Sequence, residues 1–320
     1  MVARIIGTGS AVPKQIITNE DLSKIVETSD EWICSRSGIK ERRIAKDETT
    51  TSLAILAAKN ALKNSGTAPE EIEAILVATC TPDYFFPNTA CQVQDAIGAK
   101  NAVAFDLSAA CSGFLFALST IQAYIKSGIY QKVLIIGAET MSKMIDWNDR
   151  SSCVLFGDGA GAAVVCAEKT GVIELVQKSD GSGKGVLSCK ARETRNLLKS
   201  EAEAKDYLYM EGQPVFKFAV KTVPECVEEV LKKAKVEKEE IRYYILHQAN
   251  SRIIQSVAKR LKEPEEKFPM NLSLHGNTSA ASIPILLDEM NRKGMLEKGD
   301  KIVLSGFGAG LTWGAVLLEW

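Results

Sequence analysis

Asp106-Leu-Ser-Ala-Ala-Cys111-Ser-Gly-Phe-Leu-Phe-Ala-Leu118 joins an apolar strand pattern to an apolar helical pattern and places a cysteine at the first turn of the predicted helix. The amide donors and partial positive charge at a helix N-terminus favour a thiolate over a thiol. The apolar neighbours Phe114, Leu115 and Phe116 favour the thiol instead. A nucleophilic Cys111 therefore requires the helix end to outweigh desolvation, and a buried structural cysteine is the alternative.

Strand and helix patterns alternate on both sides of this junction. Short apolar or β-branched runs predict strands at residues 4–7, 74–79, 103–107, 133–138, 162–167, 172–177, 242–246, 301–305 and 315–319. Helical periodicity predicts helices at residues 20–26, 52–64, 89–97, 112–126, 216–234, 252–261 and 280–292. Near-continuous apolar strands are typical of sheets covered on both faces, so we expect an α/β protein.

The order of these elements repeats along the chain. One strand ends at Thr79 and the next strand-to-helix junction falls at Cys111, while a later strand ends at His247 and the next junction falls at Asn277. In both cases a helix, a strand, a glycine-rich turn and a closing strand follow. The simplest account is two similar layered halves, residues 1–170 and 171–320, packed as one compact unit.

Three polar residues fall where predicted strands end, which is where functional groups gather in open α/β sheets. If the halves pack about a pseudo-twofold axis, Cys111, His247 and Asn277 converge on one pocket. Each also has a plainer interpretation. A single histidine is commonly structural, and Asn277 is a good helix N-cap, although Thr278 and Ser279 could cap equally well.

Composition excludes several classes of protein. The 320 residues are 46% hydrophobic and 25% charged, which is typical of a globular protein, and the net charge of -1 gives no overall field that would select nucleic acid. The eight cysteines form no Cys-x-x-Cys pair, so a zinc site is not expected. The chain start lacks a signal-peptide pattern and no run reaches the ~18 apolar residues of a membrane span. We therefore expect a cytoplasmic protein with free thiols and no membrane partner.

Three glycine-rich stretches, residues 7–9, 157–161 and 181–185, lack both the phosphate-loop pattern and the full dinucleotide fingerprint. We interpret them as turns and close backbone contacts, so no nicotinamide, flavin or metal cofactor is expected. His275, directly before Gly276, is interpreted as a hydrogen-bonding residue of a loop.

Seven motifs occur in a fixed order along the whole chain. They are Ile5-Ile-Gly-Thr-Gly-Ser10, Thr28-Ser-Asp-Glu-Trp-Ile33, Ser108-Ala-Ala-Cys-Ser-Gly113, Phe156-Gly-Asp-Gly-Ala-Gly161, His247-Gln-Ala-Asn250, His275-Gly-Asn-Thr-Ser279 and Gly306-Phe-Gly-Ala-Gly310. With these motifs the chain resembles the β-ketoacyl-acyl carrier protein synthases III of the thiolase superfamily from end to end. The resemblance implies a thiolase-like fold with α-β-α-β-α layers.

The resemblance also implies a Cys-His-Asn triad of Cys111, His247 and Asn277. The implied reaction joins a short acyl-CoA primer to malonyl-acyl carrier protein by decarboxylative Claisen condensation, gives 3-oxoacyl-acyl carrier protein, CoA and CO2, and initiates fatty acid synthesis. Cys111 would carry the acyl group as a thioester, and His247 and Asn277 would donate to a developing oxyanion. Backbone amides of Cys111 and residues 306–310 would hold the acylation oxyanion. Many relatives have glycine where Ala309 stands, and this difference leaves the backbone amide in place to hold the oxyanion.

Related condensing enzymes differ in the triad. Chain-elongating synthases resemble a Cys-His-His pattern and hydroxymethylglutaryl-CoA synthases a Cys-His-Glu pattern, and neither has an asparagine like Asn277. Plant-type polyketide synthases share Cys-His-Asn but are longer and lack the block at residues 28–33. The priming enzyme therefore fits best.

Further residues match binding positions of that family. Those matching CoA contacts are Thr28, Trp32, Arg36, Arg150, Gly212, Phe216, Ala249 and Asn250, and those matching a carrier-protein patch are Lys217, Arg252, Lys259 and Arg260. Phe86 matches a residue that closes the acyl pocket of the neighbouring subunit, which implies a homodimer. Taken singly, Trp32 could be a half-buried packing residue, and each charge could be solvated surface.

Two other classes remain open. Papain-like proteases also use Cys, His and Asn, but their Cys-Gly-Ser/Ala-Cys-Trp/Tyr signature is missing here. A non-catalytic acyl-CoA or carrier-protein binding relative would keep the fold, although all three triad positions are filled. The sequence does not specify the primer, because acetyl, propionyl and branched groups differ by methylenes worth only about 1–3 kcal/mol each.

Overall fold

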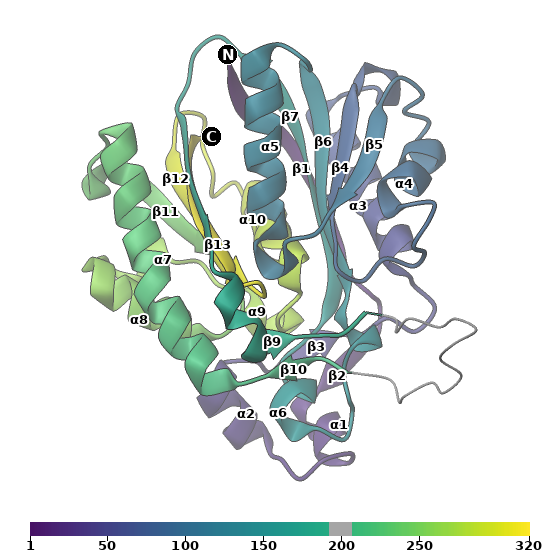
Figure 1. Cartoon of the computed structure of the whole chain (residues 1–320), viewed down its shortest axis with the longest axis vertical. Coiled ribbons are helices and arrows are strands. Elements are labelled where there is room, and N and C mark those ends of the chain that lie inside the picture. The colour runs from purple at the N-terminus through teal and green to yellow at the C-terminus, as the bar shows by residue number, and fades with distance from the viewer. Residues whose placement is uncertain (192–206) are drawn as a thin grey trace.

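The computed structural model describes residues 1–191 and 207–320. The helices are α1 (Asn19–Ser23), α2 (Asp30–Ser37), α3 (Thr50–Ser65), α4 (Thr89–Ile97), α5 (Gly113–Ser127), α6 (Arg150–Cys153), α7 (Gly212–Ala234), α8 (Ser251–Leu261), α9 (Leu272–His275) and α10 (Ser282–Arg292). The strands are β1 (Val2–Ala11), β2 (Ile16–Thr18), β3 (Glu41–Arg43), β4 (Ala74–Ala78), β5 (Val103–Leu107), β6 (Lys132–Thr140), β7 (Asp158–Glu168), β8 (Ile173–Ser179), β9 (Leu187–Ser188), β10 (Tyr209–Met210), β11 (Ile241–Leu246), β12 (Lys301–Gly308) and β13 (Thr312–Glu319). Figure 1 shows their arrangement.

Two sheets carry the same strand pattern. The first has the order β1-β7-β6-β4-β5 and the second has the order β8-β13-β12-β11. In the first, β7 is antiparallel to β1 and β6, and β6 is parallel to β4. In the second, β13 is antiparallel to β8 and β12, and β12 is parallel to β11. The second sheet therefore repeats the first without a counterpart of β5.

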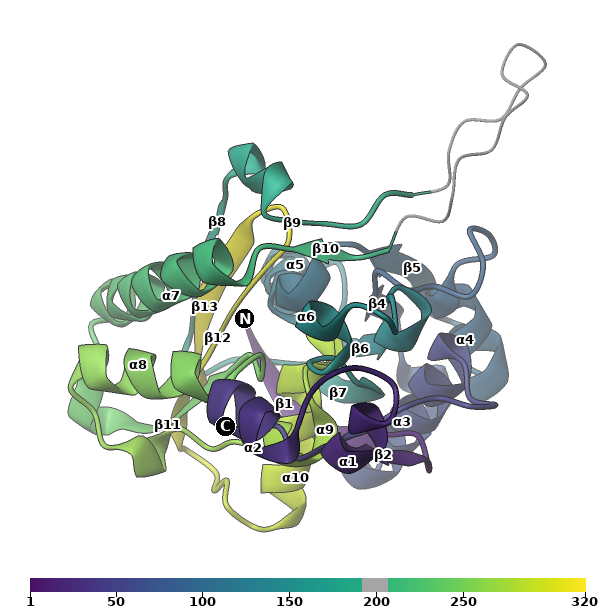
Figure 2. The same ribbon diagram turned by 90° about the horizontal axis from the view of Figure 1, so that it is seen from below.

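Helices cover both sheets and fill the space between them. One buried cluster joins α5 and α10 to the inner faces of both sheets, through residues such as Leu118, Leu286, Ile135 and Leu304. A second cluster packs α3 and α4 on the outer face of the first sheet. A third packs α7 and α8 on the outer face of the second. Figure 2 shows this sequence of layers, and the predicted α-β-α-β-α thiolase-like fold is confirmed.

Two of the glycine motifs are sites of close backbone approach, as expected. A Cβ on Gly9 would lie 2.2 Å from the Ala61 nitrogen of α3, and one on Gly161 would lie 2.6 Å from the Ile285 nitrogen of α10. Only a residue without a side chain lets each helix pack this closely on its strand. These glycines therefore serve packing.

The predicted strands and helices are present, with changes at their ends. The helix predicted at residues 20–26 stops at Ser23. Helix α2 and the short pairs β2–β3 and β9–β10 were not predicted. The boundary after residue 170 falls between β7 and β8 and stays a prediction. Within residues 1–191 and 207–320, no helix has the length and apolar character that crossing a membrane requires.

Candidate active site

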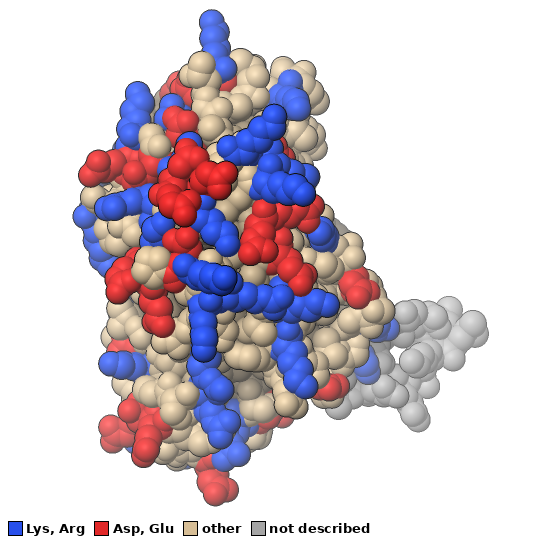
Figure 3. Space-filling view, turned by 90° about the vertical axis from the view of Figure 1, so that its left-hand side faces the viewer, with Lys and Arg blue, Asp and Glu red and all other residues tan. Residues whose placement is uncertain are grey.

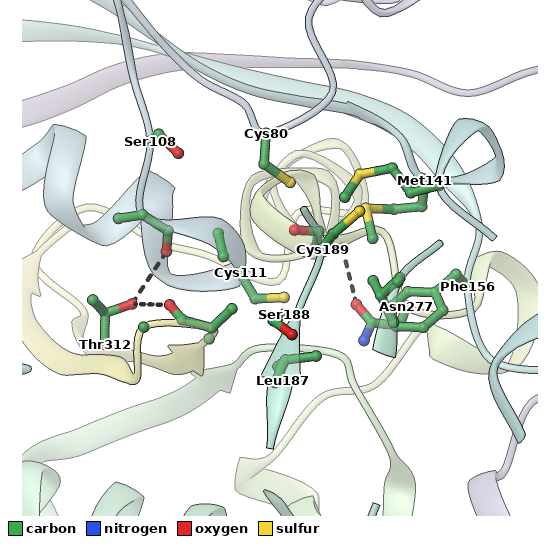
Figure 4. Close-up of a pocket in the computed structure, with 18 of the residues that line it drawn as sticks. Cys80, Ser108, Cys111, Met141, Phe156, Leu187, Ser188, Cys189, Asn277 and Thr312 are labelled. Atoms are coloured by element: carbon green, nitrogen blue, oxygen red, sulfur yellow. Dashed lines mark hydrogen bonds between the residues drawn. The ribbon is translucent and has the colours of Figure 1, made fainter. Parts of the chain in front are cut away.

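A cavity of about 910 Å³ is lined by residues of both halves. Cys111 reaches it from the turn after β5, His247 from the end of β11, and Asn277 from the segment between α9 and α10. The structure thus brings the three predicted triad residues into one cavity. Figure 4 shows Cys111 and Asn277 among the labelled lining residues.

Cys111 lies in a 3-10 turn, Ala110–Ser112, and α5 begins at Gly113, one residue later than predicted. Ala110 has a φ of +45°, so the chain turns sharply before the cysteine. Burial, with a smaller contribution from the Glu139 carboxylate, raises the pKa of the Cys111 thiol to about 12. The expectation that the helix end outweighs desolvation is therefore wrong, because burial has the larger effect on this thiol.

His247 is a buried, neutral imidazole. Its Nδ1 lies 2.7 Å from Oγ of Ser282, and its ring packs edge-on against Phe307 with ring centres 5.5 Å apart. Burial lowers the pKa of His247 to about 3. Since Nδ1 is engaged, Nε2 is the ring nitrogen left for chemistry in the cavity.

Asn277 is held on both sides by backbone pairing with the segment before β7. Its N–H donates to the Leu155 carbonyl at 2.9 Å, and its carbonyl accepts from the Gly157 N–H at 3.1 Å. Its Oδ1 accepts from the Ser279 N–H at 2.9 Å. The side-chain NH2 group is the part left to face a ligand. Asn277 is not the N-cap of α10, because a 3-10 turn comes first and Ala281 occupies the cap position.

Helix α2 places Trp32 next to two arginines. The guanidinium carbons of Arg150 and Arg36 lie 4.8 Å and 5.9 Å from the ring centre of Trp32. Thr28, just before α2, has a buried hydroxyl without a hydrogen-bond partner. The signal for α2 was available in the sequence, since Ser29 caps its start by accepting from the Trp32 N–H.

The other residues predicted to contact CoA connect this surface to the cavity. The four that line the cavity are Gly212, Phe216, Ala249 and Asn250. Nδ2 of Asn250 donates to the Arg36 carbonyl at 2.9 Å, which joins the cavity wall to α2. A continuous set of predicted ligand contacts therefore runs from Trp32 to the triad.

The predicted carrier-protein residues lie on the exposed sides of α7 and α8. Lys217 is exposed on α7, and Arg252, Lys259 and Arg260 are exposed on α8. Figure 3, which views the side of the molecule that carries these helices, shows Lys and Arg gathered there beside acidic residues. Arg252 lies over the Phe216 ring at 5.8 Å. Arg260 pairs with Glu225 at 3.5 Å and is the member least available to a partner.

Phe86 lies outside the cavity of its own chain. It is 86% exposed, and the adjacent Phe85 and Tyr84 are 73% and 59% exposed. Three consecutive exposed aromatic side chains form an apolar patch of a kind that monomers rarely leave uncovered.

Several residues near the triad had no sequence signal. Glu139 at the end of β6, Ser279 and Ser282 hydrogen-bond to one another or to triad residues across the fold. His275 is buried at the end of α9 and not in a loop, with Nε2 at 2.7 Å from Glu289 Oε1. No group of three or more His, Cys, Asp or Glu within the described part of the chain is arranged to hold a metal ion.

Comparison with known proteins identifies the family. Residues 105–181 match the family described as 3-oxoacyl-[acyl-carrier-protein (ACP)] synthase III, and residues 231–320 match the C-terminal region of the same family. The β-ketoacyl-[acyl-carrier-protein] synthase III of Clostridium novyi is 54% identical over 99% of this chain and 98% of the relative. The chain belongs to this family.

Other synthases III are similar to this chain along almost its whole length. That of Clostridium acetobutylicum is 52% identical over 99% of this chain and 98% of its own length. The crystal structure of the Aquifex aeolicus synthase III superposes with a TM-score of 0.93 at 48% identity, covering 99% of this chain and 100% of that one. The chain is thus a condensing acyltransferase that carries out the initiating condensation of fatty acid synthesis.

More distant solved structures share the fold. A priming β-ketosynthase of a polyketide pathway is 36% identical with a TM-score of 0.93, covering 99% of this chain and 96% of that one. The OleA protein of Xanthomonas campestris is 19% identical with a TM-score of 0.86, a likeness that extends to the fold alone. None of these relatives is named as a protease, so the protease alternative finds no support in them.

Proposed function

We propose that Cys111 takes a short acyl group from acyl-CoA and passes it to an enolate derived from malonyl-acyl carrier protein. The observation that carries this assignment is that Cys111, His247 and Asn277, from three separate segments, line the same cavity of about 910 Å³. Its largely apolar lining suits an acyl chain.

In the first half-reaction a bond forms between the Cys111 sulfur and the acyl carbon, and the bond from that carbon to the CoA sulfur breaks. The exchange of one thioester for another keeps the acyl group reactive. In the second, the malonyl group loses CO2, and the resulting enolate carbon attacks the acyl carbon. The bond to Cys111 breaks and leaves a thiolate that must be protonated.

His247 and Asn277 serve the second half-reaction as hydrogen-bond donors. Decarboxylation generates its own carbanion, so the site needs donors for the enolate oxygen and not a strong base. A histidine whose pKa is lowered to about 3 stays neutral and can present Nε2–H. The Asn277 amide supplies a second donor, because its Oδ1 is already occupied by the Ser279 N–H.

The residues predicted to bind CoA, the carrier protein and a second copy of the chain can be assigned roles in the same reaction. Trp32, with Arg150 and Arg36, would hold the adenine of CoA by stacking and cation–π attraction. Lys217, Arg252 and Lys259 would attract the acidic carrier protein. Phe86 and its aromatic neighbours would pack against a second copy of the chain and close its acyl pocket. No organic cofactor or metal takes part in these steps, and a cytoplasmic location stays a prediction.

Mass spectrometry of the intact protein tests the proposal. We expect a mixture of acetyl-, propionyl- and isobutyryl-CoA to add one acyl mass, which identifies the primer, and Cys111→Ala to add none while remaining folded. Acyl addition to Cys111→Ala, or full condensing activity of that variant, would overturn the assignment.

A further inference from the structure

Two loops that belong to different sheets meet at the backbone of Cys111. One is the 3-10 turn Ala110–Ser112, which follows β5, and the other is the end of the hairpin that joins β12 to β13. A Cβ on Gly308 would lie 2.7 Å from the Cys111 nitrogen and 3.2 Å from the Ser112 nitrogen. Only a residue without a side chain allows this approach. The amide of the nucleophile therefore lies directly against the hairpin.

The hydroxyl groups of Ser112 and Thr312 join these two loops. Their oxygens are 2.7 Å apart, although 200 residues separate them in the chain. Ser112 Oγ also lies 2.8 Å from the Ala109 carbonyl. Thr312 Oγ1 lies 3.1 Å from the Ala309 carbonyl and 3.3 Å from the Ala109 carbonyl, and Figure 4 draws both contacts at Thr312. Because Ser112 is fully buried, its hydroxyl depends on these protein partners.

Each hydroxyl carries one proton, and the distances allow only arrangements that join the loops. Two hydroxyl oxygens that are 2.7 Å apart hold one proton between them. When Ser112 donates to Thr312, the Thr312 proton goes to the carbonyl of Ala309 or Ala109. When Thr312 donates to Ser112, the Ser112 proton goes to Ala109. In either case a hydrogen bond crosses from the turn of Cys111 to the hairpin.

The N–H of Cys111 is not used to close its own turn. The turn is closed by the N–H groups of Ser112 and Gly113, which donate to the carbonyls of Ala109 and Ala110. The first N–H groups of a helical turn have no acceptor within it. Attack of the Cys111 sulfur on an acyl carbon gives the carbonyl oxygen a negative charge, which such N–H groups stabilise when they are already in place. The spacing between the turn and the hairpin therefore affects the reaction.

We propose that Ser112 and Thr312 are positioning residues that set the spacing between the Cys111 amide and the amides of residues 306–310, an inference that rests on the proposed function. The pair acts through the backbone of the two loops and does not itself bind the oxyanion. It is required for fast acylation, in which a carbonyl oxygen gains negative charge. It is not required for alkylation of the same sulfur by iodoacetamide, which displaces iodide at a saturated carbon and forms no oxyanion.

Thr312→Val tests the role because the two reactions share a nucleophile but only acylation forms an oxyanion. Valine keeps the shape of the side chain and removes the hydroxyl, and Ser112 can still donate to the Ala109 carbonyl. We expect acylation of Cys111 by acyl-CoA, followed by intact mass, to slow about 10-fold. Alkylation at pH 8 should stay within about twofold of the wild type. Acylation at the wild-type rate, or equal slowing of both reactions, would overturn the proposal.

Two further variants keep the test decisive if Thr312→Val folds poorly. Ser112→Ala breaks the same bond from the other side, so it should also slow acylation more than alkylation. Thr312→Ser retains the hydroxyl and should acylate at nearly the wild-type rate. If Thr312→Ser is as slow as Thr312→Val, the hydroxyl is not responsible for the effect and the proposal fails.

A double-mutant cycle tests whether the two hydroxyls act through one bond. Ser112→Ala combined with Thr312→Val should slow acylation no more than Thr312→Val alone. Effects that multiply would show independent roles and would contradict the proposed pair. Thr120→Val on α5 is the matched control, because the Thr120 hydroxyl donates to the Phe116 carbonyl at 2.9 Å within a single helix. We expect it to change neither rate, and an effect as large as that of Thr312→Val would count against the proposal.

Cys111→Ala separates the two levels of inference. Acyl mass gained by this variant would refute the role of Cys111 itself. No acyl mass on it, combined with wild-type acylation of Thr312→Val, would refute the positioning role alone.

Discussion

Nδ1 of His247 lies 2.7 Å from Oγ of Ser282, although 35 residues separate them in the chain. The same hydroxyl accepts from the Gln248 N–H at 3.3 Å, which leaves its own proton free to be donated to Nδ1. A donor at Nδ1 places the imidazole hydrogen on Nε2, the tautomer needed to donate to an enolate oxygen. Ser282 is thus a positioning residue for His247.

Ser282→Ala should lower the rate of condensation about 10-fold, because His247 loses the bond that orders its ring and tautomer. Acylation of Cys111 should change little, since that step does not require the Nε2 donor. The two half-reactions can be measured separately by malonyl decarboxylation and by acyl mass. Equal effects on both would contradict the role given to Ser282.

Acidification should destabilise the protein through His247. The ordinary pKa is 6.5 and burial lowers it to about 3, so between these values the unfolded chain binds a proton that the folded protein does not. The stability that this group contributes is complete above pH 6.5 and is lost as the pH falls below that value. At pH 5 the loss is about 2 kcal/mol. The free energy of unfolding, measured with urea at pH 7 and pH 5, should fall less for His247→Asn than for the wild type. An equal loss in both proteins would show that His247 titrates normally.

Alkylation of Cys111 in the unliganded protein should rise about tenfold with each pH unit from 7 to 10, because only the thiolate reacts. The pKa of about 12 places the plateau beyond this range. Peptide mass spectrometry after iodoacetamide treatment assigns the modified cysteine. A plateau near pH 7 would instead indicate a thiolate stabilised in the resting protein.

Trp32→Ala should raise the KM for acyl-CoA about 10-fold through loss of the stacking and cation–π surface. The second half-reaction, started from enzyme already acylated, should be unaffected because CoA has left. Arg150→Lys keeps the charge and should have a smaller effect. An unchanged KM for Trp32→Ala would remove α2 from the CoA site.

Phe86→Asp should convert a dimer to monomers, because it places a charge in the aromatic patch proposed to meet a second copy. Analytical ultracentrifugation measures the change. Ile25→Asp is the control, since Ile25 is also an exposed apolar residue, at 57%, but lies outside the patch. A wild-type protein that sediments as a monomer would refute the dimer.

Local sequence was sufficient for most of the secondary structure. The run from Asp106 to Leu118 predicts the strand-to-helix junction that is present, because alternation and helical periodicity are short-range signals. The repeat of elements predicts two similar halves, and the sheets confirm it by their matching strand orders. Helix α2 was missed although Ser29 and Gly38 mark its ends, because its face lacks a strong apolar period.

The chemical state of the site came only from tertiary structure. The sequence correctly places Cys111 and His247 after strands, but Asn277 lies between α9 and α10 and not at a strand end. The family resemblance relates the three residues to a triad. The sequence does not determine that burial keeps Cys111 as a thiol and His247 neutral, nor that the Glu139 carboxylate adds to the rise in the pKa of Cys111. Ionisation depends on solvent exclusion and on charges and hydrogen bonds from residues distant in the chain. Packing of two sheets around α5 and α10 sets these conditions, and no local pattern encodes them.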